Sequence, residues 1–252
     1  MATRLKVTVR YDGTDFAGWQ IQPGLRTIQG VIEEALAQIA SRPVRIHAAS
    51  RTDAGVHALG QVFSCDWPGS MTPERLGEAL SKMLRPDVRI ERIEEAPPGF
   101  HARFDARGKR YAYTLDLSLH ADPFLLRYAW LVPWPLDIEH LGALAQRLVG
   151  THDFAGFQAA GTAVKVTTRT ISSIGIESSG VVAPCDASSL ARLVFHGDGF
   201  LYKMVRNITG TLVDIARGNQ PEGRLEELLA SVGPYRGFTA PAHGLTLLEV
   251  LY

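Results

Sequence analysis

The sequence has few of the residues that would build a disulfide framework or hold a metal ion. Only two cysteines occur among its 252 residues, Cys65 and Cys185, and they are far apart, without Cys-x-x-Cys spacing. This pattern argues against a disulfide-stabilised fold and a zinc site, and it is typical of a reducing compartment. The eight histidines show neither His-x-x-x-His nor His-Glu-x-x-His spacing, so metal catalysis has little support.

Long apolar runs and nucleotide-binding motifs are also missing. No stretch approaches the length of a membrane span, and the N-terminal residues lack the apolar core of a signal peptide. No P-loop or dinucleotide-binding glycine pattern occurs, and Ser50 lacks the nucleophile elbow of a hydrolase triad. We therefore expect a soluble, cytoplasmic protein that needs neither a cofactor nor a metal and contacts no membrane.

Charge of one sign is not in excess, because 26 basic residues balance 26 acidic ones. A neutral balance is unusual for a nucleic-acid-binding protein, since phosphate contacts normally leave a basic footprint. The basic residues nevertheless gather in short segments, at 42–51, 103–110, 165–169 and 203–206. A fold that collected these segments on one face would give a neutral protein a positive groove, so the charge permits nucleic-acid binding without identifying it.

The periodicity of the first half predicts an α+β fold. Alternating apolar residues are typical of strands, whereas apolar residues three and four apart predict helices, the first with Thr27 as its N-cap. The expected strands cover residues 5–11, 44–50, 59–66 and a stretch from 88, and the expected helices run from 28 to 39 and from 73 to 84. This order is the β-α-β-β-α-β arrangement of ferredoxin-like folds.

The second half is expected to be α+β as well. A Pro/Gly-rich connector at 96–99 suggests two domains, residues 1–98 and 99–252. The strands expected beyond it lie at 111–117, 168–177, 190–197 and 246–251, and the helices at 138–149, 201–217 and 221–231.

The most informative stretch covers residues 51–58, RTDAGVHA. In it, Asp53 follows Arg51, whose planar guanidinium can hold a neighbouring carboxylate ionised and oriented. Gly55 permits a turn with positive φ and lets a ligand approach the backbone. An isolated Asp-Ala-Gly would indicate a polar turn with an N-cap Asp, but four further segments accompany this one.

The five segments are residues 11–20 (YDGTDFAGWQ), 51–58, 100–107 (FHARFDAR) followed by 110–113 (RYAY), 199–208 (GFLYKMVRNI) and 239–245 (TAPAHGL). Together they make the chain resemble the tRNA pseudouridine synthase A family. In this order they span almost the whole chain. The resemblance implies two ferredoxin-like halves that share a continuous, mainly antiparallel sheet, with helices on one face and a central cleft.

The resemblance also implies an activity, the isomerisation of uridine to pseudouridine at positions 38, 39 and 40 of the tRNA anticodon stem-loop by a homodimer. Breaking the N-glycosidic bond, turning the uracil and rejoining it through carbon requires an ionised carboxylate in a pocket that excludes water. By resemblance Asp53 is this carboxylate, the nucleophile. Attack on the sugar carbon, attack on the base and removal of a ribose proton are all compatible with the sequence.

Further site residues follow from the family motifs and from chemistry. Arg206 matches the basic partner of the carboxylate, and Tyr111 matches the aromatic residue that stacks on the uracil. The expected substrate-binding residues are Tyr111, Arg51, Leu245, Arg107, Lys109 and Arg110. The structural alternatives are a solvated helix residue for Arg206, core packing for Tyr111 and Leu245, and a solvated strand edge for Arg107, Lys109 and Arg110.

A different class of protein also fits the scaffold, an RNA-binding or folding module without catalysis. Such a module would be free to replace Asp53, Tyr111 or Arg206, and the presence of all three favours the enzyme. The apolar residues around Trp130 and Trp134 fit either a dimer interface or a core.

Overall fold

The computed structural model of the chain describes residues 2–161, 164–178 and 189–252. The chain forms two compact units, Met1–Arg107 with Thr246–Tyr252, and Gly108–Leu245. Both units are α+β with mainly antiparallel pairing of strands, as predicted. Within these described residues, no helix is long and apolar enough to cross a membrane.

The first unit has the predicted β-α-β-β-α-β order. Its elements are β1 (Thr3–Tyr11), α1 (Ile28–Ala40), β2 (Ile46–Ala48), β3 (His57–Trp67), α2 (Pro73–Met83) and β4 (Val88–Glu95), joined by β10 (Leu245–Leu251). Antiparallel β1 pairs with β3 and β4, and short β2 pairs antiparallel with one end of β3. At the other end of β3, β10 adds a parallel pair, with Thr246 opposite His57.

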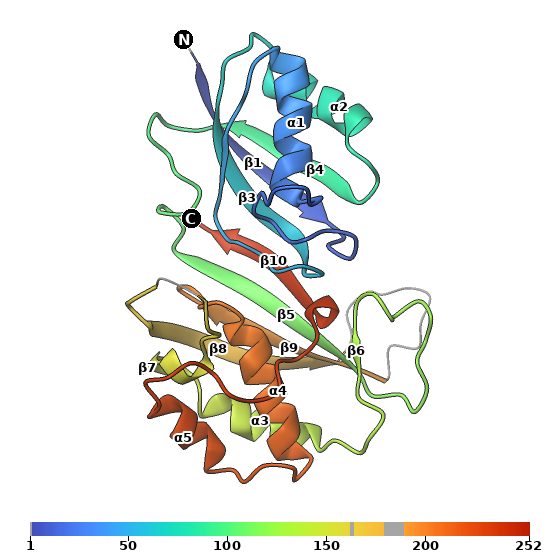
Figure 1. Cartoon of the computed structure of the whole chain (residues 1–252), viewed down its shortest axis with the longest axis vertical. Helices are drawn as coiled ribbons and strands as arrows, with labels where there is room; N and C mark the ends of the chain where they lie inside the picture. The colour runs from blue at the N-terminus through green and yellow to red at the C-terminus, as the bar shows by residue number, and fades with distance from the viewer. Residues whose placement is uncertain (1, 162–163, 179–188) are drawn as a thin grey trace. The chain divides into compact units, whose positions relative to one another are not determined.

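The helices of this unit form as the sequence predicts. The side chain of Thr27 caps α1 by accepting a hydrogen bond from the backbone N–H of Gly30 at 3.2 Å. Ile28, Ile32 and Leu36 of α1 are buried, and so are two leucines of α2. Both helices lie on one face of the sheet formed by β1, β3 and β4 (Figure 1). Cys65 in β3 is buried, which raises the pKa of its thiol to about 12 and makes it an apolar core residue.

The domain boundary expected between residues 98 and 99 is wrong, because residues 100–107 are part of the first unit. The segment 100–102 and the C-terminal residues pack against Ala49 and Val62 in a small apolar cluster. The hydroxyl of Tyr252 donates to the carbonyl oxygen of Ala102 at 2.7 Å, and Ala102 N–H donates to Ser64 Oγ at 3.1 Å. Residues up to 107 and residues 246–252 therefore group with the first unit.

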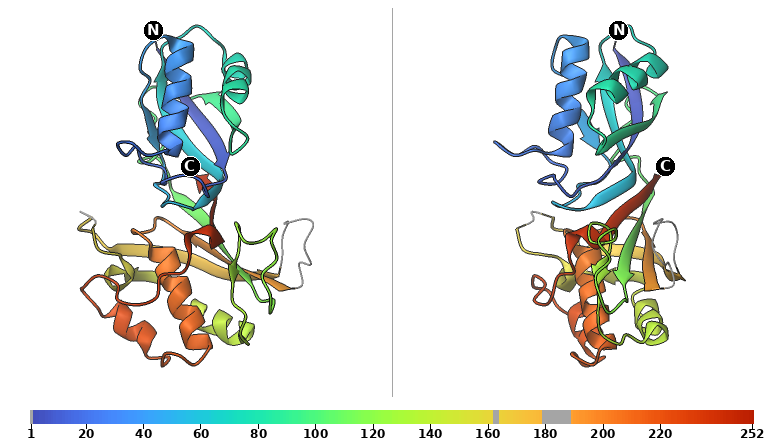
Figure 2. Two further views of the ribbon diagram at one scale, coloured as in Figure 1. Left: turned by 45° about the vertical axis from the view of Figure 1, so that its right-hand side comes forward. Right: turned by 90° about the vertical axis from the view of Figure 1, so that its right-hand side faces the viewer.

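The second unit has a sheet in the order β5-β9-β8-β7. Its elements are β5 (Gly108–Asp116), β6 (Trp130–Leu131), α3 (Ile138–Gln146), β7 (Gly150–Asp153), a short 3-10 helix η1 (Ala155–Phe157), β8 (Thr168–Ser178), β9 (Leu190–Gly197), α4 (Met204–Ala216), α5 (Arg224–Leu229) and a second short 3-10 helix, η3 (Ala242–Gly244). Helices α3 and α4 pack together on one side of β8 and β9 (Figure 2).

The helices of the second unit differ in their limits from the sequence-based ones, and the helix expected over 221–231 is the shorter α5. The helix expected over 138–149 ends at Gln146, where Leu148 N–H donates to the carbonyl oxygen of Ala145 and tightens the chain into a turn. The helix expected from residue 201 begins only at Met204, because Lys203 has a left-handed backbone conformation, with φ of 58°. The two-residue β6 and four-residue β7 were not predicted.

Candidate active site

Asp53 lies in the loop between β2 and β3, which we call the aspartate loop (residues 50–56). The side chain of Asp53 is partly exposed, Arg51 is exposed, and Thr52 between them is buried. Gly55 has a φ of 77°, the left-handed conformation expected of it. Val56 N–H donates to the carbonyl oxygen of Asp53 at 3.2 Å and closes the turn. The loop thus presents the carboxylate from a tight turn.

Buried polar side chains hold the loop on the N-terminal side of Asp53. Gln61 of β3 is fully buried, and its amide bridges both backbone groups of Ser50: Nε2 donates to the carbonyl oxygen at 2.9 Å, and Oε1 accepts from the N–H at 3.3 Å. The hydroxyls of Thr52 and Tyr11 lie 2.8 Å apart and share a hydrogen bond. The residues on both sides of Arg51 are therefore fixed from within the core.

The first family-like segment forms a second loop, residues 12–20, which packs directly against the aspartate loop. Trp19 N–H donates to the carbonyl oxygen of Thr52 at 3.0 Å. Gly18 has a φ of 93°, and a Cβ added there would lie 2.8 Å from the same carbonyl oxygen. A Cβ added at Gly13 would lie 2.0 Å from the carbonyl oxygen of Val56. Both contacts require glycine, so the two loops interlock through their backbones.

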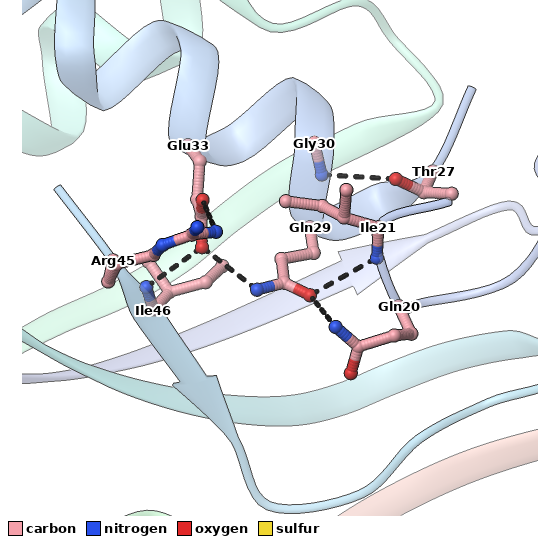
Figure 3. A network of polar contacts seen from close by, with 8 residues as sticks. All are labelled: Gln20, Ile21, Thr27, Gln29, Gly30, Glu33, Arg45 and Ile46. Carbon is pink, nitrogen blue, oxygen red and sulfur yellow. Dashed lines mark hydrogen bonds and ion pairs between the residues drawn. The ribbon is translucent and has the colours of Figure 1, made fainter. Parts of the chain in front are cut away.

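Gln29 in the first turn of α1 ties the loop over 12–20 to the helix, as Figure 3 shows. Its Oε1 accepts hydrogen bonds from Gln20 Nε2 at 2.9 Å and from Ile21 N–H at 3.3 Å. Its Nε2 donates to Glu33 Oε1 at 2.8 Å, one helical turn further on. A single amide therefore uses both of its ends to connect the loop with the helix.

Glu33 carries this network on to β2, the strand that leads into the aspartate loop (Figure 3). Its carboxylate accepts from Ile46 N–H at 3.1 Å and from the guanidinium of Arg45 at 3.1 Å. Glu33 is largely buried, whereas the side chain of Arg45 is 74% exposed, so solvent screens their charge interaction strongly. The anchoring of β2 thus depends chiefly on the bond from Ile46.

The expected tyrosine belongs to the second unit. Tyr111 in β5 is buried, and its ring and that of Phe200 form a T-shaped pair with a centroid distance of 5.2 Å. Tyr113, on the same face of β5, is completely buried and donates its hydroxyl to the carbonyl oxygen of Pro241 at 2.7 Å. Burial raises the pKa of the Tyr113 hydroxyl, and the charge of Arg206 acts in the opposite direction. Tyr113 is therefore a core residue.

Arg206, in the first turn of α4, is partly buried, which is unlike a solvated helix residue. Its Nε donates to the carbonyl oxygen of Ala240 at 2.8 Å, and its own carbonyl oxygen accepts from Ala240 N–H at 3.2 Å. The chain after Ala240 passes the ring of Tyr113, where a Cβ added at Gly244 would lie 2.7 Å from the ring, and then reaches buried Leu245. The second unit thus brings Arg206 and the segment before Leu245 together.

The expected phosphate contacts are more dispersed than their closeness in sequence suggests. Arg107 is exposed, and its backbone N–H donates to the carbonyl oxygen of Leu251 at 2.8 Å, within the first unit. Lys109 and Arg110 are successive residues of β5, opposite Gly197 and His196 of β9. Successive strand residues point to opposite faces of a sheet, so Lys109 shares the face of Tyr111 and Arg110 does not.

Comparisons with known proteins decide the family. A family model described as tRNA pseudouridine synthase matches residues 7–105 and 144–252. The chain belongs to the tRNA pseudouridine synthase family. It is 39% identical to tRNA pseudouridine synthase A of Latilactobacillus sakei over 254 residues, covering 100% of both chains, and 40% identical to that of Streptococcus suis, covering 99% of both. The protein of that name from Solidesulfovibrio magneticus is 45% identical over 99% of this chain and 91% of its own.

Solved structures give a much weaker likeness. A chain of a Cbf5–Nop10–Gar1 complex aligns with 96% of this chain and 57% of its own length, at 11% identity and a TM-score of 0.38. This likeness is too slight to bear on the site of a tRNA pseudouridine synthase.

Sequence reasoning missed the residues that position the aspartate loop of this family member, namely Gly13, Gly18, Gln29, Glu33 and Gln61. The signal that could have revealed Gln61 is its place in the run Gly60-Gln61-Val62-Phe63, where a polar side chain stands among apolar ones. Metal binding gains no support from the geometry, since the described part of the chain holds no cluster of three His, Cys, Asp or Glu side chains suited to an ion.

Proposed function

We propose that the protein is a tRNA pseudouridine synthase that isomerises uridine at positions 38, 39 and 40 of the anticodon stem-loop. Family membership supports the reaction, and the resemblance of the five segments to the tRNA pseudouridine synthase A family supports the positions. The observation that carries the proposal is the aspartate loop, whose turn presents Asp53 while Gln61 and Trp19 hold the backbone on its N-terminal side.

In the proposed reaction, the bond between the ribose C1′ and the uracil N1 breaks and a bond from C1′ to C5 forms. C5 loses its hydrogen as a proton and N1 gains one, so the nucleoside is neither oxidised nor reduced and no redox partner is needed. Asp53 is the nucleophile of this proposal. Attack at the sugar carbon, attack at the base and abstraction of a ribose proton all end in the same loss of the C5 proton.

The second unit contributes the remaining catalytic groups of the proposal. Tyr111 stacks on the flipped uracil, a contact worth about 1–3 kcal/mol per base, and its phenol helps to remove the C5 proton. Arg206 stabilises the ionised carboxylate, as an arginine fork suits this role better than a lysine. Its bond to the carbonyl oxygen of Ala240 at 2.8 Å supports a fixed side chain rather than a solvated one.

Substrate binding in the proposal rests on an apolar wall and on phosphate contacts from cations, of which Arg51 and Arg107 are exposed and Lys109 and Arg110 are partly buried. Leu245 forms the wall, and Arg51, Arg107, Lys109 and Arg110 contact the tRNA. The active form is a homodimer in the cytoplasm, where tRNA is modified. Light scattering of the purified protein tests this stoichiometry directly, since a monomer with full activity contradicts it.

The decisive experiment follows the hydrogen at C5. Incubation of the protein with tRNA transcripts carrying tritium at C5 of uridine should release tritium to water without added metal, nucleotide or reductant. Rising salt should weaken the reaction, because phosphate contacts are screened. A catalytically inactive RNA-binding module would instead retain the tRNA on a filter and release no tritium, and that result would replace the enzyme with the alternative.

Variants assign the roles. Asp53→Asn should abolish tritium release and keep tRNA binding, because a partly exposed loop carboxylate contributes little to the core. Arg206→Ala should also abolish tritium release, and Arg206→Lys should restore it in part. The matched control is Arg224→Ala, which loses an exposed ion pair with Glu227 and should keep parental activity. Arg206 would lie outside the site if the rate of tritium release by Arg206→Ala stayed within about threefold of the parent rate, a change of less than 1.4 kcal/mol in the barrier.

A further inference from the structure

Three aromatic rings form a row on the surface of the first unit. The ring of His47, in β2, lies 5.2 Å from that of His101, which lies 4.3 Å from that of Phe104. Successive rings are inclined by only 34° and 35°, so they follow one another in a tilted stack. Phe104 at the end of the row is 74% exposed, and His47 at the other end is exposed as well.

The row is held in place by the backbone of its own segment. His101 N–H donates to Asp105 Oδ2 at 2.8 Å, and Arg103 N–H donates to His101 Nδ1 at 3.1 Å. Nδ1 is therefore an acceptor and the neutral ring carries its proton on Nε2. Burial lowers the pKa of the His101 imidazole, and the neighbouring His47 and Arg4 act in the same direction, which favours the neutral ring.

The segment that carries the row is rigidly attached to the unit. Arg4 Nε donates to the carbonyl oxygen of Phe100 at 2.6 Å, and the following Ala102 is completely buried, with its N–H on Ser64 Oγ. An exposed ring on a fixed segment loses little conformational freedom when it meets a ligand, so the contact keeps most of its free energy.

The segment that carries His101 and Phe104 also carries two arginines, Arg103 and Arg107. The guanidinium of Arg103 lies 5.8 Å from the centroid of Phe104, and exposed Arg107 follows three residues later. The nearest acid of the segment, Asp105, is engaged by the backbone of His101. An exposed aromatic face beside cations matches an unpaired nucleobase between two phosphates, because bases stack on aromatic rings and phosphates pair with arginine.

We propose that Phe104, backed by His101 and His47, is a stacking platform for an unpaired base of the bound RNA, with Arg103 and Arg107 on the adjoining phosphates. The inference rests on the proposed function, since it takes tRNA as the ligand. His47 precedes Asp53 by six residues, which at about 3.5 Å per residue limits their separation to about 21 Å. One RNA arm can therefore reach both, and the proposal assigns the base on the platform to a nucleotide other than the reacting uridine.

Binding and turnover test the platform with separate readouts. Phe104→Ala should weaken the Kd for a tRNA transcript about tenfold, which corresponds to about 1.4 kcal/mol. It should raise KM for tritium release by a similar factor and leave kcat unchanged, because the contact is the same in the ground and transition states. Phe124→Ala, which truncates another exposed phenylalanine (63%) of the second unit, is the matched control with parental Kd.

Phe104→Trp preserves the ring and provides a direct signal. Its Kd should stay within about twofold of the parent, within about 0.4 kcal/mol, and its added fluorescence should be quenched when tRNA binds. Parental affinity of Phe104→Ala for tRNA, or no quenching in Phe104→Trp, would overturn the platform. The proposed function would still hold in that case if the parent protein releases tritium. Failure of the parent itself to bind tRNA would instead refute the proposed function.

Discussion

Replacing Gln61 with leucine tests whether the aspartate loop depends on its buried anchor. Gln61 is fully buried in β3 and occupies both backbone groups of Ser50, three residues before Asp53. Leucine has a similar volume but no polar atoms, so Gln61→Leu opens no large cavity. It leaves the N–H and the carbonyl oxygen of Ser50 without this partner, and the backbone of the loop is free to shift.

The magnitude follows from the hydrogen bonds that are lost. An unsatisfied buried polar group costs about 1–3 kcal/mol, and Ser50 is only partly buried, so its two groups together cost about 2–4 kcal/mol of unfolding free energy. The Val62 N–H and the Tyr11 hydroxyl also lose Gln61 as a partner, so this figure is a lower bound. A native stability of about 5–15 kcal/mol leaves the variant folded at 25 °C. A displacement of the nucleophile by about 1 Å can lower the rate about 100-fold, so kcat should fall at least tenfold.

The assay combines urea unfolding with tritium release at saturating tRNA. Leu80→Ala is the control, because Leu80 is fully buried in α2 of the same unit and its truncation costs about 2–5 kcal/mol. This control should lose comparable stability and keep kcat within about twofold of the parent, less than 0.5 kcal/mol in the barrier. A parental kcat in Gln61→Leu, or an equal fall of kcat in Leu80→Ala, would refute the positioning role.

Two further predictions concern the glycine contact and the tyrosine pair. Gly18→Ala should lower both stability and kcat, because its Cβ would press on the carbonyl oxygen of Thr52. The control is Gly24→Ala, with φ of 73° and no atom within 4 Å of its added Cβ, which should cost only about 1–3 kcal/mol of backbone strain and keep kcat. Equal kcat in both variants would contradict the interlocking of the loops. Tyr113→Phe should lower the unfolding free energy by about 1–3 kcal/mol and preserve turnover, since it leaves the carbonyl oxygen of Pro241 unsatisfied. Tyr111→Phe should do the reverse, and thermal melts beside tritium release distinguish the two.

The secondary structure of the first unit was predictable because its elements depend on local signals. The alternation in β1 and the cap at Thr27 each lie within a few residues of the element they define. The pairing of β10 with β3 was not predictable, since it joins Thr246 to His57 across most of the chain. The two residues of β6 are too few to show any period, and they form a strand only because β5 lies beside them.

The residues of the candidate site also differ in whether a local sequence signal predicts them. Asp53 and Gly55 were predicted from a short motif, and the positive φ of Gly55 agrees with its expected turn. The strand period alone predicts that Lys109 and Arg110 lie on opposite faces of the sheet. This prediction could be made only once β5 was known to begin at Gly108. The role of each basic residue therefore depends on an element boundary, the least certain part of a sequence-based prediction.

The buried anchors escaped sequence analysis for a physical reason. A polar residue in a strand pattern is normally assigned to the solvent face, yet Gln61 and Ser64 are both completely buried in β3. The helices cover one face of this strand, and the cluster of Ala49, Val62 and Ala102 covers part of the other. A polar side chain enclosed in this way must be hydrogen-bonded, and its partners here are the backbone groups of irregular segments that have no ladder of their own. Burial of Gln61 is thus the means by which a regular strand fixes the irregular loop that carries Asp53.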